Sequence, residues 1–285
     1  MSSPKTIDPC PCESGFITKE CCKKKGKWFK EPKFIYIPGE TSFQHPDCYM
    51  NLLSDCSGDI SREHYVSKII LEGISAKTVQ IKGPTFLQGE EKTIGIANLT
   101  SKILCKYHNN SFSVLDSESG RLFERLKQIY KRNHDCSSFS IFSGHDIELW
   151  LLKTLISTFI SLGNEIELSY LSKILTLEES FKYPLGFYIV DAKDMYLYQS
   201  VKTDVKITED SKMGRFDFHL YSLPLVLVFN EDFITSDLRY RPRKIRFQTG
   251  KDFDVIELSW KEKMNTPIIS FELIKQVENE RPPGY

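Results

Sequence analysis

The spacing of apolar residues predicts helices in the middle of the chain. Leu122, Leu126 and Ile129 recur at intervals of four and three residues, which places them on one face of a helix. A second apolar face runs through 147–159, where Asp146 is expected to be the N-cap. A further helical pattern follows at 166–177, so three helices are expected, each with one buried face.

Beyond residue 185 the apolar pattern changes to short runs of the kind that form strands. Pro, Gly, Asn and Asp bound these runs, as they commonly bound strands. Strands are predicted at 186–191, 196–207, 215–229, 239–247 and 254–260. Two helices followed by about five strands are typical of an α+β domain, here with a mostly antiparallel sheet.

The composition indicates a folded protein without an overall preference for polyanions. Hydrophobic residues make up 40% of the chain and charged residues 27%, which excludes wholesale disorder, a collagen-like fibre and a coiled-coil rod. Lys plus Arg and Asp plus Glu each number 38. Any contact with nucleic acid must therefore come from local patches, and residues 1–33 and 236–251 are both strongly basic.

No targeting or membrane segment is expected, and the protein is predicted to be cytoplasmic. Residues 1–9 lack the apolar core of a signal peptide. The most apolar stretch, 149–162, is interrupted by Lys153 and is shorter than the roughly 20 residues that a bilayer requires. In a chain without a secretory signal, the eight Cys favour metal binding or chemistry over a disulfide framework.

Four of the cysteines lie close together near the N-terminus: Cys10, Cys12, Cys21 and Cys22. Four thiolates at this spacing can enclose one tetrahedral Zn²⁺, and the alternative is a run of free thiols. The C-x-C and C-C pairs, with Gly15 and Lys19, resemble the SEC-C motif, a zinc knuckle of the SecA translocase that is appended to many bacterial proteins. A closed four-thiolate site leaves no position for a substrate, so the knuckle is expected to dock on nucleic acid or a protein partner.

A second set of ligand-type residues is spread over a longer stretch: Cys48, Cys56, Cys105 and His108. Glu63 and His64 form a pair on a predicted short strand, Asn98 follows, and Asn109 comes directly after His108. This order, with C-x-x-H-N opening a helix, resembles the HNH endonuclease family over residues 45–132. That family folds as a β-hairpin and a helix around one catalytic metal (the ββα-metal fold).

The resemblance implies a role for each polar residue. His64 matches the general base, and Glu63 matches the acidic ligand of the catalytic metal. Asn98 matches the residue that braces the hairpin loop, and Asn109 matches a second metal ligand. The products in this family carry 5′-phosphate and 3′-hydroxyl ends, and a double-strand break could require a homodimer because HNH sites often make one cut per monomer.

The resemblance also implies a structural zinc with four ligands: Cys48, Cys56, Cys105 and His108. The first pair in the family is usually C-x-x-C, whereas seven residues separate Cys48 from Cys56 here. His45 lies three residues before Cys48 and could replace Cys56. An inserted strand-like stretch at 78–82 lengthens the hairpin. The alternative is a single structural zinc site in which His64 and Asn109 are ordinary hairpin residues.

The residue types suit phosphodiester hydrolysis, which needs an activated water and a cation beside the leaving oxygen. A neutral imidazole, with a pKa of about 6.5, suits the base role at neutral pH. A carboxylate with an amide oxygen suits Mg²⁺ or Mn²⁺. Consecutive strand residues face opposite ways, so Glu63 and His64 serve one cation only if the strand bulges or water bridges one of them.

Two groups of cationic residues are candidates for contact with nucleic acid: Arg121, Lys127 and Lys131 on the predicted helix, and Arg239, Arg241 and Arg243 in an aromatic and cationic run. For the helix, the alternative is a solvated face. For the run, the alternative is an edge strand, because Pro242 disfavours a central one and cations protect edges from aggregation.

The sequence therefore predicts a zinc knuckle with a basic segment at 1–33, an HNH nuclease-like domain at 34–135 and a C-terminal α+β domain at 136–285. The function expected from the resemblance is an endonuclease acting on nucleic acid, DNA in particular, with two structural Zn²⁺ and a catalytic Mg²⁺ or Mn²⁺. This architecture suggests a bacterial defence or toxin effector. The alternatives are a non-catalytic zinc adaptor for nucleic acid or protein, and a redox protein using Cys21 and Cys22.

Overall fold

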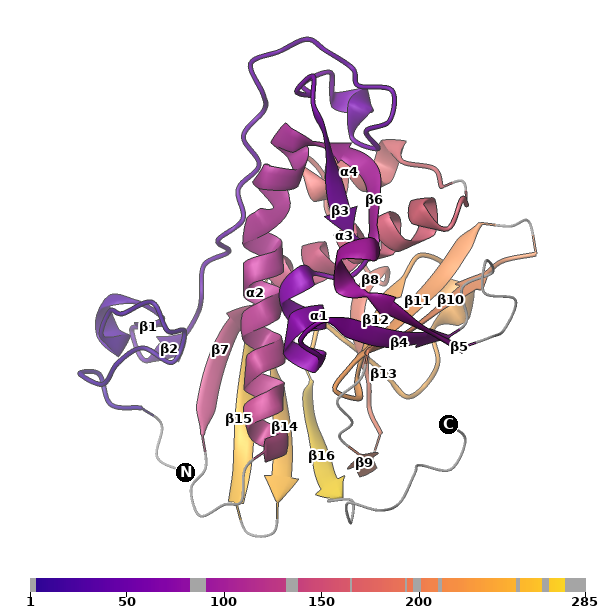
Figure 1. Ribbon diagram of the computed structural model, residues 1–285. Helices are drawn as coiled ribbons and strands as arrows, with labels where there is room; N and C mark the ends of the chain where they lie inside the picture. Colours follow the sequence, from indigo (N-terminus) through magenta and orange to yellow (C-terminus); the bar gives the residue numbers. More distant parts are fainter. Residues whose placement is uncertain are drawn as a thin grey trace.

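The long helix α2 (Lys106–Lys131) runs through the middle of the molecule (Figure 1). A computed structural model describes residues 4–82, 91–131, 138–164, 166–192, 194–196, 201–209, 212–249, 252–262 and 267–274. A small N-terminal unit with strands β1 (Lys23–Lys24) and β2 (Lys27–Trp28) lies to one side of α2. Two five-stranded sheets make up most of the rest, so the α+β class is confirmed.

The helices follow the apolar pattern of the sequence. Leu122, Leu126 and Ile129 are all buried on α2. The other α-helices are α1 (Lys68–Ile74), α3 (Gly144–Ser161) and α4 (Ser169–Leu175). The expected N-cap of α3 is wrong by three residues, because Ser143 caps the helix by accepting from the Asp146 N–H at 3.2 Å. Asp146 is buried and accepts instead from the backbone N–H groups of Lys33 and Phe34.

Strands β3 (Ile60–His64) and β6 (Thr100–Cys105) pair antiparallel, and α2 begins directly after β6. Between these two strands the chain inserts α1 and a second hairpin, β4 (Thr78–Lys82) with β5 (Glu91–Gly95). The predicted strand at 78–82 is thus confirmed. Short 3-10 helices occur at Thr18–Glu20, Asn51–Leu53, Ile96–Asn98 and Glu231–Phe233.

The first five-stranded sheet is antiparallel throughout, in the order β10-β11-β12-β8-β13. Its strands are β8 (Gly186–Val190), β10 (Val201–Ile207), β11 (Met213–Leu220), β12 (Leu223–Val228) and β13 (Leu238–Tyr240). Strand β12 is buried at every position, as expected for a central strand.

The second sheet has the order β7-β15-β14-β16-β9, and only β14 and β15 pair antiparallel. Its strands are β7 (Phe139–Ser143), β9 (Asp194–Tyr196), β14 (Lys244–Thr249), β15 (Asp252–Ser259) and β16 (Ile268–Ile274). The prediction of one mostly antiparallel sheet is therefore wrong for this half. Strands β7 and β16 are not predicted from the sequence.

The predicted strand 196–207 contributes Tyr196 to β9 and 201–207 to β10, which belong to different sheets. Two further predicted strands are each divided by a turn or bend. The segment 215–229 forms the hairpin of β11 and β12, which turns at Tyr221 and Ser222 with φ values of 49° and 64°. Two consecutive positive φ values are typical of the tight turn that joins two antiparallel strands. The segment 239–247 bends at Arg241, with φ of 39°, and continues into the other sheet.

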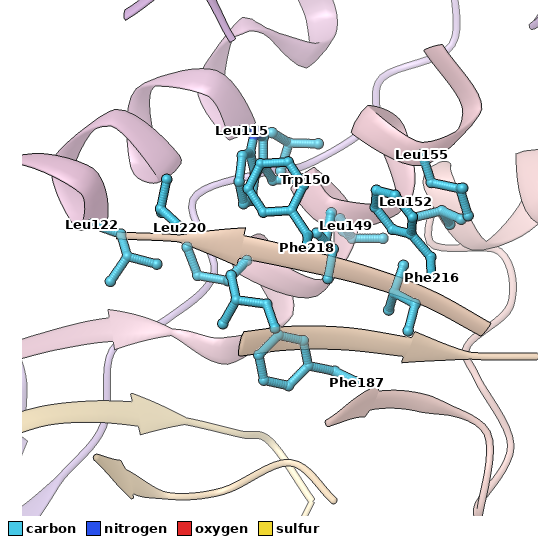
Figure 2. Close-up of a cluster of buried hydrophobic side chains, with 14 of the residues drawn as sticks. Leu115, Leu122, Leu149, Trp150, Leu152, Leu155, Phe187, Phe216, Phe218 and Leu220 are labelled. Atoms are coloured by element: carbon cyan, nitrogen blue, oxygen red, sulfur yellow. The ribbon is translucent and has the colours of Figure 1, made fainter. Parts of the chain in front are cut away.

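One hydrophobic core joins the parts that the sequence separates into domains. Figure 2 shows side chains of α2 and α3, among them Leu115, Leu122, Trp150 and Leu152, packed over Phe187, Phe216 and Phe218 of the first sheet. The same cluster of buried residues extends from Phe34 to Phe271. The predicted HNH region and C-terminal region therefore share a core. The predicted boundary at 135/136 lies outside the described residues.

In the part of the chain that the structure describes, no helix combines the length and the apolar character needed to cross a membrane.

Candidate functional site

The N-terminal cysteines converge as the sequence predicts. The sulfur atoms of Cys10, Cys12, Cys21 and Cys22 lie within 4.8 Å of one another. Cys12 and Cys21 are 3.3 Å apart at sulfur, and Cys21 and Cys22 are 3.6 Å apart. Ligands of a tetrahedral zinc with Zn–S bonds of about 2.3 Å are separated by similar distances. Hydrogen bonds from neighbouring thiols, Cys22 first, hold the pKa of Cys12 well below its usual value. The bond to Cys12 raises the pKa of Cys22 and burial raises that of Cys10, so Cys12 is the member most readily ionised.

The knuckle packs against α2 and β7. Ile141 of β7 is buried in one cluster with three of the cysteines, and the ring of Trp28 contacts that of Phe139 at a tilt of 44°, with ring centres 4.8 Å apart. The Arg121 guanidinium donates to the carbonyl oxygens of Cys12 and Ile141, at 3.1 and 3.0 Å. The expectation that Arg121 contacts nucleic acid is therefore wrong, because its donors hold the knuckle on the body of the protein.

Glu118 of α2 extends this attachment to the segment that follows the knuckle. Its carboxylate lies 2.5 Å from Lys33, 3.8 Å from Lys30 and 3.0 Å from Arg121. Burial acts to raise the pKa of Glu118, but Arg121 and the two lysines outweigh it and lower the pKa. The carboxylate is therefore ionised at neutral pH and pairs with three cations.

The second predicted ligand set also converges. Its four members are all buried, with their ligand atoms within 4.8 Å of one another: Cys48, Cys56, Cys105 and His108. The Nδ1 atom of His108 lies 3.1 Å from the sulfur of Cys105, 3.4 Å from that of Cys48 and 3.8 Å from that of Cys56. Both clusters can thus hold a metal ion and are compatible with zinc.

His45 does not belong to this second cluster. Its Nδ1 atom accepts from the Asp47 N–H at 3.2 Å, and Cys56 supplies the fourth ligand atom. The suggestion that His45 replaces Cys56 is therefore wrong. The seven-residue separation is bridged by a 3-10 helix, Asn51–Leu53, which turns the chain back so that both cysteines face His108.

Two residues that the sequence does not single out hold the ring of His108. Its Nε2 atom lies 3.0 Å from Asp55 Oδ1 and 2.9 Å from the Tyr36 hydroxyl, which donates to Asp55 Oδ2 at 2.5 Å. The hydroxyl of Tyr36 already donates to Asp55, so it accepts from the Nε2–H of His108, which keeps the proton on the outer nitrogen and leaves the Nδ1 lone pair for a metal. Burial lowers the pKa of His108, with Asp55 acting the other way, so the ring is neutral as a metal ligand requires.

Glu63 lies at the end of β3 in a buried charged cluster. Its side chain is 7% exposed, and Oε1 lies 2.5 Å from the Lys153 ammonium. That ammonium also lies 2.7 Å from Asp116 Oδ2. Ser67 donates to Asp116 Oδ1 at 2.5 Å and accepts from the Trp150 N–H at 2.8 Å. Strand β3 and helices α2 and α3 therefore meet at this cluster.

The charges in this cluster stabilise one another. Burial alone would lower the pKa of Lys153, but Asp116 and Glu63 outweigh it and raise the pKa, so the ammonium persists at neutral pH. Burial raises the pKa of Glu63, with Lys153 acting in the opposite direction. The sequence carries one signal for this cluster that belongs to no motif. A lysine inside an otherwise apolar helix requires a buried partner.

His64 is half-buried beside the cluster. Its Nε2 atom is buried and has no hydrogen-bond partner among the described residues. Burial, and then the nearby Lys68, lower the pKa of His64, while Asp116 acts to raise it. The pairing with β6 shifts register between Ser61 and Glu63, so the strand is irregular just before the pair. Glu63 and His64 themselves pair with consecutive residues of β6, and ordinary alternation holds between them.

The two predicted asparagines, Asn98 and Asn109, differ in exposure and lie on different elements. Asn98 is exposed at the end of a 3-10 helix, and the nearby loop is held by a backbone bond from Tyr65 N–H to Leu99 O at 3.2 Å. Asn109 is half-buried in the first turn of α2. The residue of α2 that contacts the same Lys153 ammonium as Glu63 is Asp116. Asp116 lies seven residues after Asn109, which is about 10 Å further along the helix axis. The convergence of His64 with Asn109 stays a prediction.

Four of the other cationic residues predicted to contact nucleic acid lie at exposed or partly exposed positions. Lys131 is exposed at the end of α2, and Lys127 donates to the carbonyl oxygen of Gly73. Arg239 and Arg243 are partly exposed, with side chains 37% and 50% accessible, and they form ion pairs with Asp191 and Glu257. These positions are compatible with surface contacts.

Arg241 is the exception, because its side chain is 3% exposed. Its Nε and Nη2 atoms lie 3.2 and 2.7 Å from the two carboxylate oxygens of Glu148 on α3. The Phe187 N–H donates to the same carboxylate at 2.9 Å. The expectation that Arg241 contacts nucleic acid is wrong, since this bidentate pair joins α3 to the bend between β13 and β14.

Comparison of the chain with models of protein families, with curated proteins and with solved structures gave no significant match in any of the three.

Proposed function

We propose that this protein is a metal-dependent nuclease of the HNH type that hydrolyses phosphodiester bonds in nucleic acid, DNA in particular. The observation that carries the proposal is the position of His64. Its buried Nε2 atom has no hydrogen-bond partner among the described residues, and Glu63 and Asp116 lie in the neighbouring cluster. A neutral imidazole without such a partner could act as a general base once a water reaches it. Because alternation turns His64 away from Glu63, a water would have to bridge the two residues.

The carboxylates nearest to His64 are the candidate ligands of the catalytic ion, but the Lys153 ammonium already pairs with both of them. Glu63 and Asp116 bring carboxylate oxygens to one buried place, where a positive charge, the Lys153 ammonium, already lies between them. Oxygen ligands of this type suit Mg²⁺ or Mn²⁺. Glu63 and Asp116 would hold the ion only if the Lys153 ammonium left its place between them. The family-matched Asn109 lies about 10 Å from Asp116 along the axis of α2. When bound, such an ion supplies positive charge to the leaving 3′ oxygen.

The residues of the chain would then act in sequence around the phosphodiester. His64 takes a proton from the attacking water, which requires its imidazole to be neutral, as burial favours. Asn98, by the resemblance, holds the loop after β3 in place. Hydrolysis leaves a 5′-phosphate and a 3′-hydroxyl.

The two cysteine clusters would bind Zn²⁺ as structural ions. The second ties the segment before β3 to the start of α2, since its ligands come from Cys48, Cys56, the end of β6 and the first turn of α2. The knuckle, fixed on α2 by Arg121, would orient a nucleic acid or protein partner. A cytoplasmic defence or toxin role, with the two-sheet part choosing the target, completes the proposal.

The proposal is tested by nicking of supercoiled plasmid with Mg²⁺ or Mn²⁺. We expect the wild type to nick, and His64→Ala to lose nicking with its zinc content unchanged. His219→Ala is a matched control, because it removes a half-buried histidine of β11. Equal nicking by wild type and His64→Ala, at matched purity, would contradict the proposal.

A second candidate function, a non-catalytic zinc adaptor, is favoured by a specific contact. The Lys153 ammonium 2.5 Å from Glu63 already satisfies one carboxylate oxygen of the residue matched to the metal ligand. An adaptor would bind nucleic acid or a protein through its zinc modules without cleaving. The same plasmid assay separates the two functions, because the adaptor predicts no nicking by any variant.

A further inference from the structure

The β1–β2 hairpin carries three exposed lysines at its tip: Lys24, Lys25 and Lys27. Lys24 lies directly opposite Lys27, and the turn between them consists of residues 25 and 26, with φ values of 49° and 76°. Two consecutive positive φ values are typical of a tight two-residue turn, which fixes the two strands relative to each other. Among the residues that the structure describes, no acidic side chain pairs with any of the three lysines.

Three other lysines of the basic N-terminal segment are held within the protein. The Lys23 ammonium donates to the carbonyl oxygen of Pro4 at 3.1 Å. Lys30 and Lys33 lie 3.8 and 2.5 Å from the buried carboxylate of Glu118. The structure therefore separates the cations that attach this segment to the body from the three at the hairpin tip, which face the solvent.

The three charges at the tip repel one another. Directly opposed residues on paired strands have their Cβ atoms about 4.5–5.5 Å apart, and like charges at such positions destabilise the pairing. Lys24 and Lys27 are such a pair, and Lys25 adds a third positive charge in the turn. An anion bound at the tip would remove this repulsion, so the tip is complementary to a ligand with several negative charges.

The chemistry of the tip favours a phosphate backbone over a protein surface. Protein–protein interfaces are enriched in aromatic side chains and depleted of lysine. Trp28, the aromatic residue of the hairpin, instead packs on Phe139 of the body, with ring centres 4.8 Å apart. Contacts with nucleic-acid phosphates come largely from Lys and Arg and need no apolar patch. The hairpin is also fixed to the knuckle, because the Phe29 N–H donates to the Cys22 carbonyl oxygen at 2.7 Å.

We propose that Lys24, Lys25 and Lys27 bind the phosphate backbone of nucleic acid. The inference rests on the proposed function and names nucleic acid as the partner that the knuckle engages. Phosphate contacts carry no direct sequence information, so the hairpin contributes affinity and orientation rather than sequence specificity. Its physical signature is a steep dependence of binding on salt, because each neutralised phosphate releases condensed counterions.

The test is the fluorescence anisotropy of a labelled DNA duplex bound by the full chain, with its zinc sites filled and without Mg²⁺ or Mn²⁺. The affinity is measured over a series of salt concentrations. For B-DNA, the logarithm of the binding constant falls with the logarithm of the salt concentration with a slope of about −0.9 for each phosphate neutralised. A triple variant with Lys24→Gln, Lys25→Gln and Lys27→Gln should make this slope shallower by about 2–3, and its Kd at about 100 mM salt should rise by about tenfold or more.

The matched control replaces three other exposed lysines by Gln: Lys173, Lys202 and Lys206. These residues lie on α4 and β10, on the other side of α2 from the knuckle (Figure 1), and none of them is a predicted contact of nucleic acid. The control loses the same net charge as the hairpin variant. It should bind the duplex with the affinity and the slope of the wild type.

A second hairpin variant, with Lys24→Arg, Lys25→Arg and Lys27→Arg, separates charge from folding because it keeps the positive charges. It should bind as the wild type does. Three results would each overturn the inference: equal affinity and slope in the wild type and the Gln variant, an Arg variant that binds as weakly as the Gln variant, and a wild type that does not bind the duplex. A wild type that binds phosphatidylglycerol vesicles but not the duplex would assign the tip to a lipid surface instead.

These outcomes are separate from the plasmid assay. Duplex binding that depends on the three lysines, without nicking, refutes only the nuclease. Nicking together with duplex binding that ignores the three lysines refutes only the inference.

Discussion

Replacement of Asp55 by Asn probes the residue that holds the ring of His108. Asp55 Oδ1 faces the His108 Nε2 atom at 3.0 Å, while Oδ2 accepts from the Tyr36 hydroxyl at 2.5 Å and from the Gly39 N–H at 3.0 Å. The Oδ1 atom accepts no hydrogen bond from the described residues, so the carboxylate acts on the ring through its charge and through Tyr36. An amide has one oxygen, so Asp55→Asn must turn its NH₂ group toward either the ring or the other two donors.

The magnitude follows from the role of such partners in metal sites. Loss of the carboxylate that orients a ligating histidine commonly weakens metal binding by about 10–100-fold. This corresponds to about 1.4–2.7 kcal/mol. The assay is competition for zinc with a chromophoric chelator, which resolves two classes of site. One zinc should become weaker by that factor, and the knuckle zinc should keep its affinity.

Asp47→Asn is the matched control, because Asp47 is an exposed acid in the same loop and should leave both zinc affinities unchanged. Two results would refute the reasoning. Wild-type affinity at both sites in Asp55→Asn would mean that the carboxylate does not orient the ring. Equal weakening of both sites would mean that the substitution disturbs the whole fold.

Three further predictions concern ligand identity, a buried ion pair and pH. His45→Ala should retain two zinc per chain by elemental analysis, and a value near one would restore His45 as a ligand. Arg241→Met should lower the free energy of unfolding in urea by about 3–5 kcal/mol, because it leaves Glu148 buried and unpaired, whereas the partly exposed Arg239→Met should cost less than about 1 kcal/mol. Glu118→Gln should destabilise the protein at pH 7. Because the folded-state pKa of Glu118 is lowered, its contribution is present above the unfolded pKa and is lost as the pH falls through the folded pKa. The difference between wild type and variant in urea unfolding should therefore close toward acidic pH, and a constant difference would contradict this origin.

Contacts between residues that are close together in the chain can be predicted from the sequence alone. The four knuckle cysteines lie within thirteen residues, so a turn suffices to bring them together. The apolar stripe of α2 fixes its buried face by helical period alone. The second ligand set was identified from its order along the chain, although its first pair departs from the usual spacing.

Contacts between distant segments could not be predicted in this way. Lys153 meets Glu63 across 90 positions, and Tyr36 meets His108 across 72. No periodicity links such residues, because their proximity depends on how α2, α3 and the segment after the knuckle pack. Arg241 shows the opposite error: a run of cations suggested a surface, while the pairing partner, Glu148, lay on a separate helix.

The most direct test of hydrolysis at His64 is cleavage in water enriched in ¹⁸O. The account predicts that the wild type, with Mn²⁺, places one ¹⁸O atom in each new 5′-phosphate, as mass spectrometry of the released ends would show. His64→Ala should yield no labelled ends. Labelled 3′-phosphates, or labelled 5′-phosphates at the wild-type rate from His64→Ala, would contradict the account.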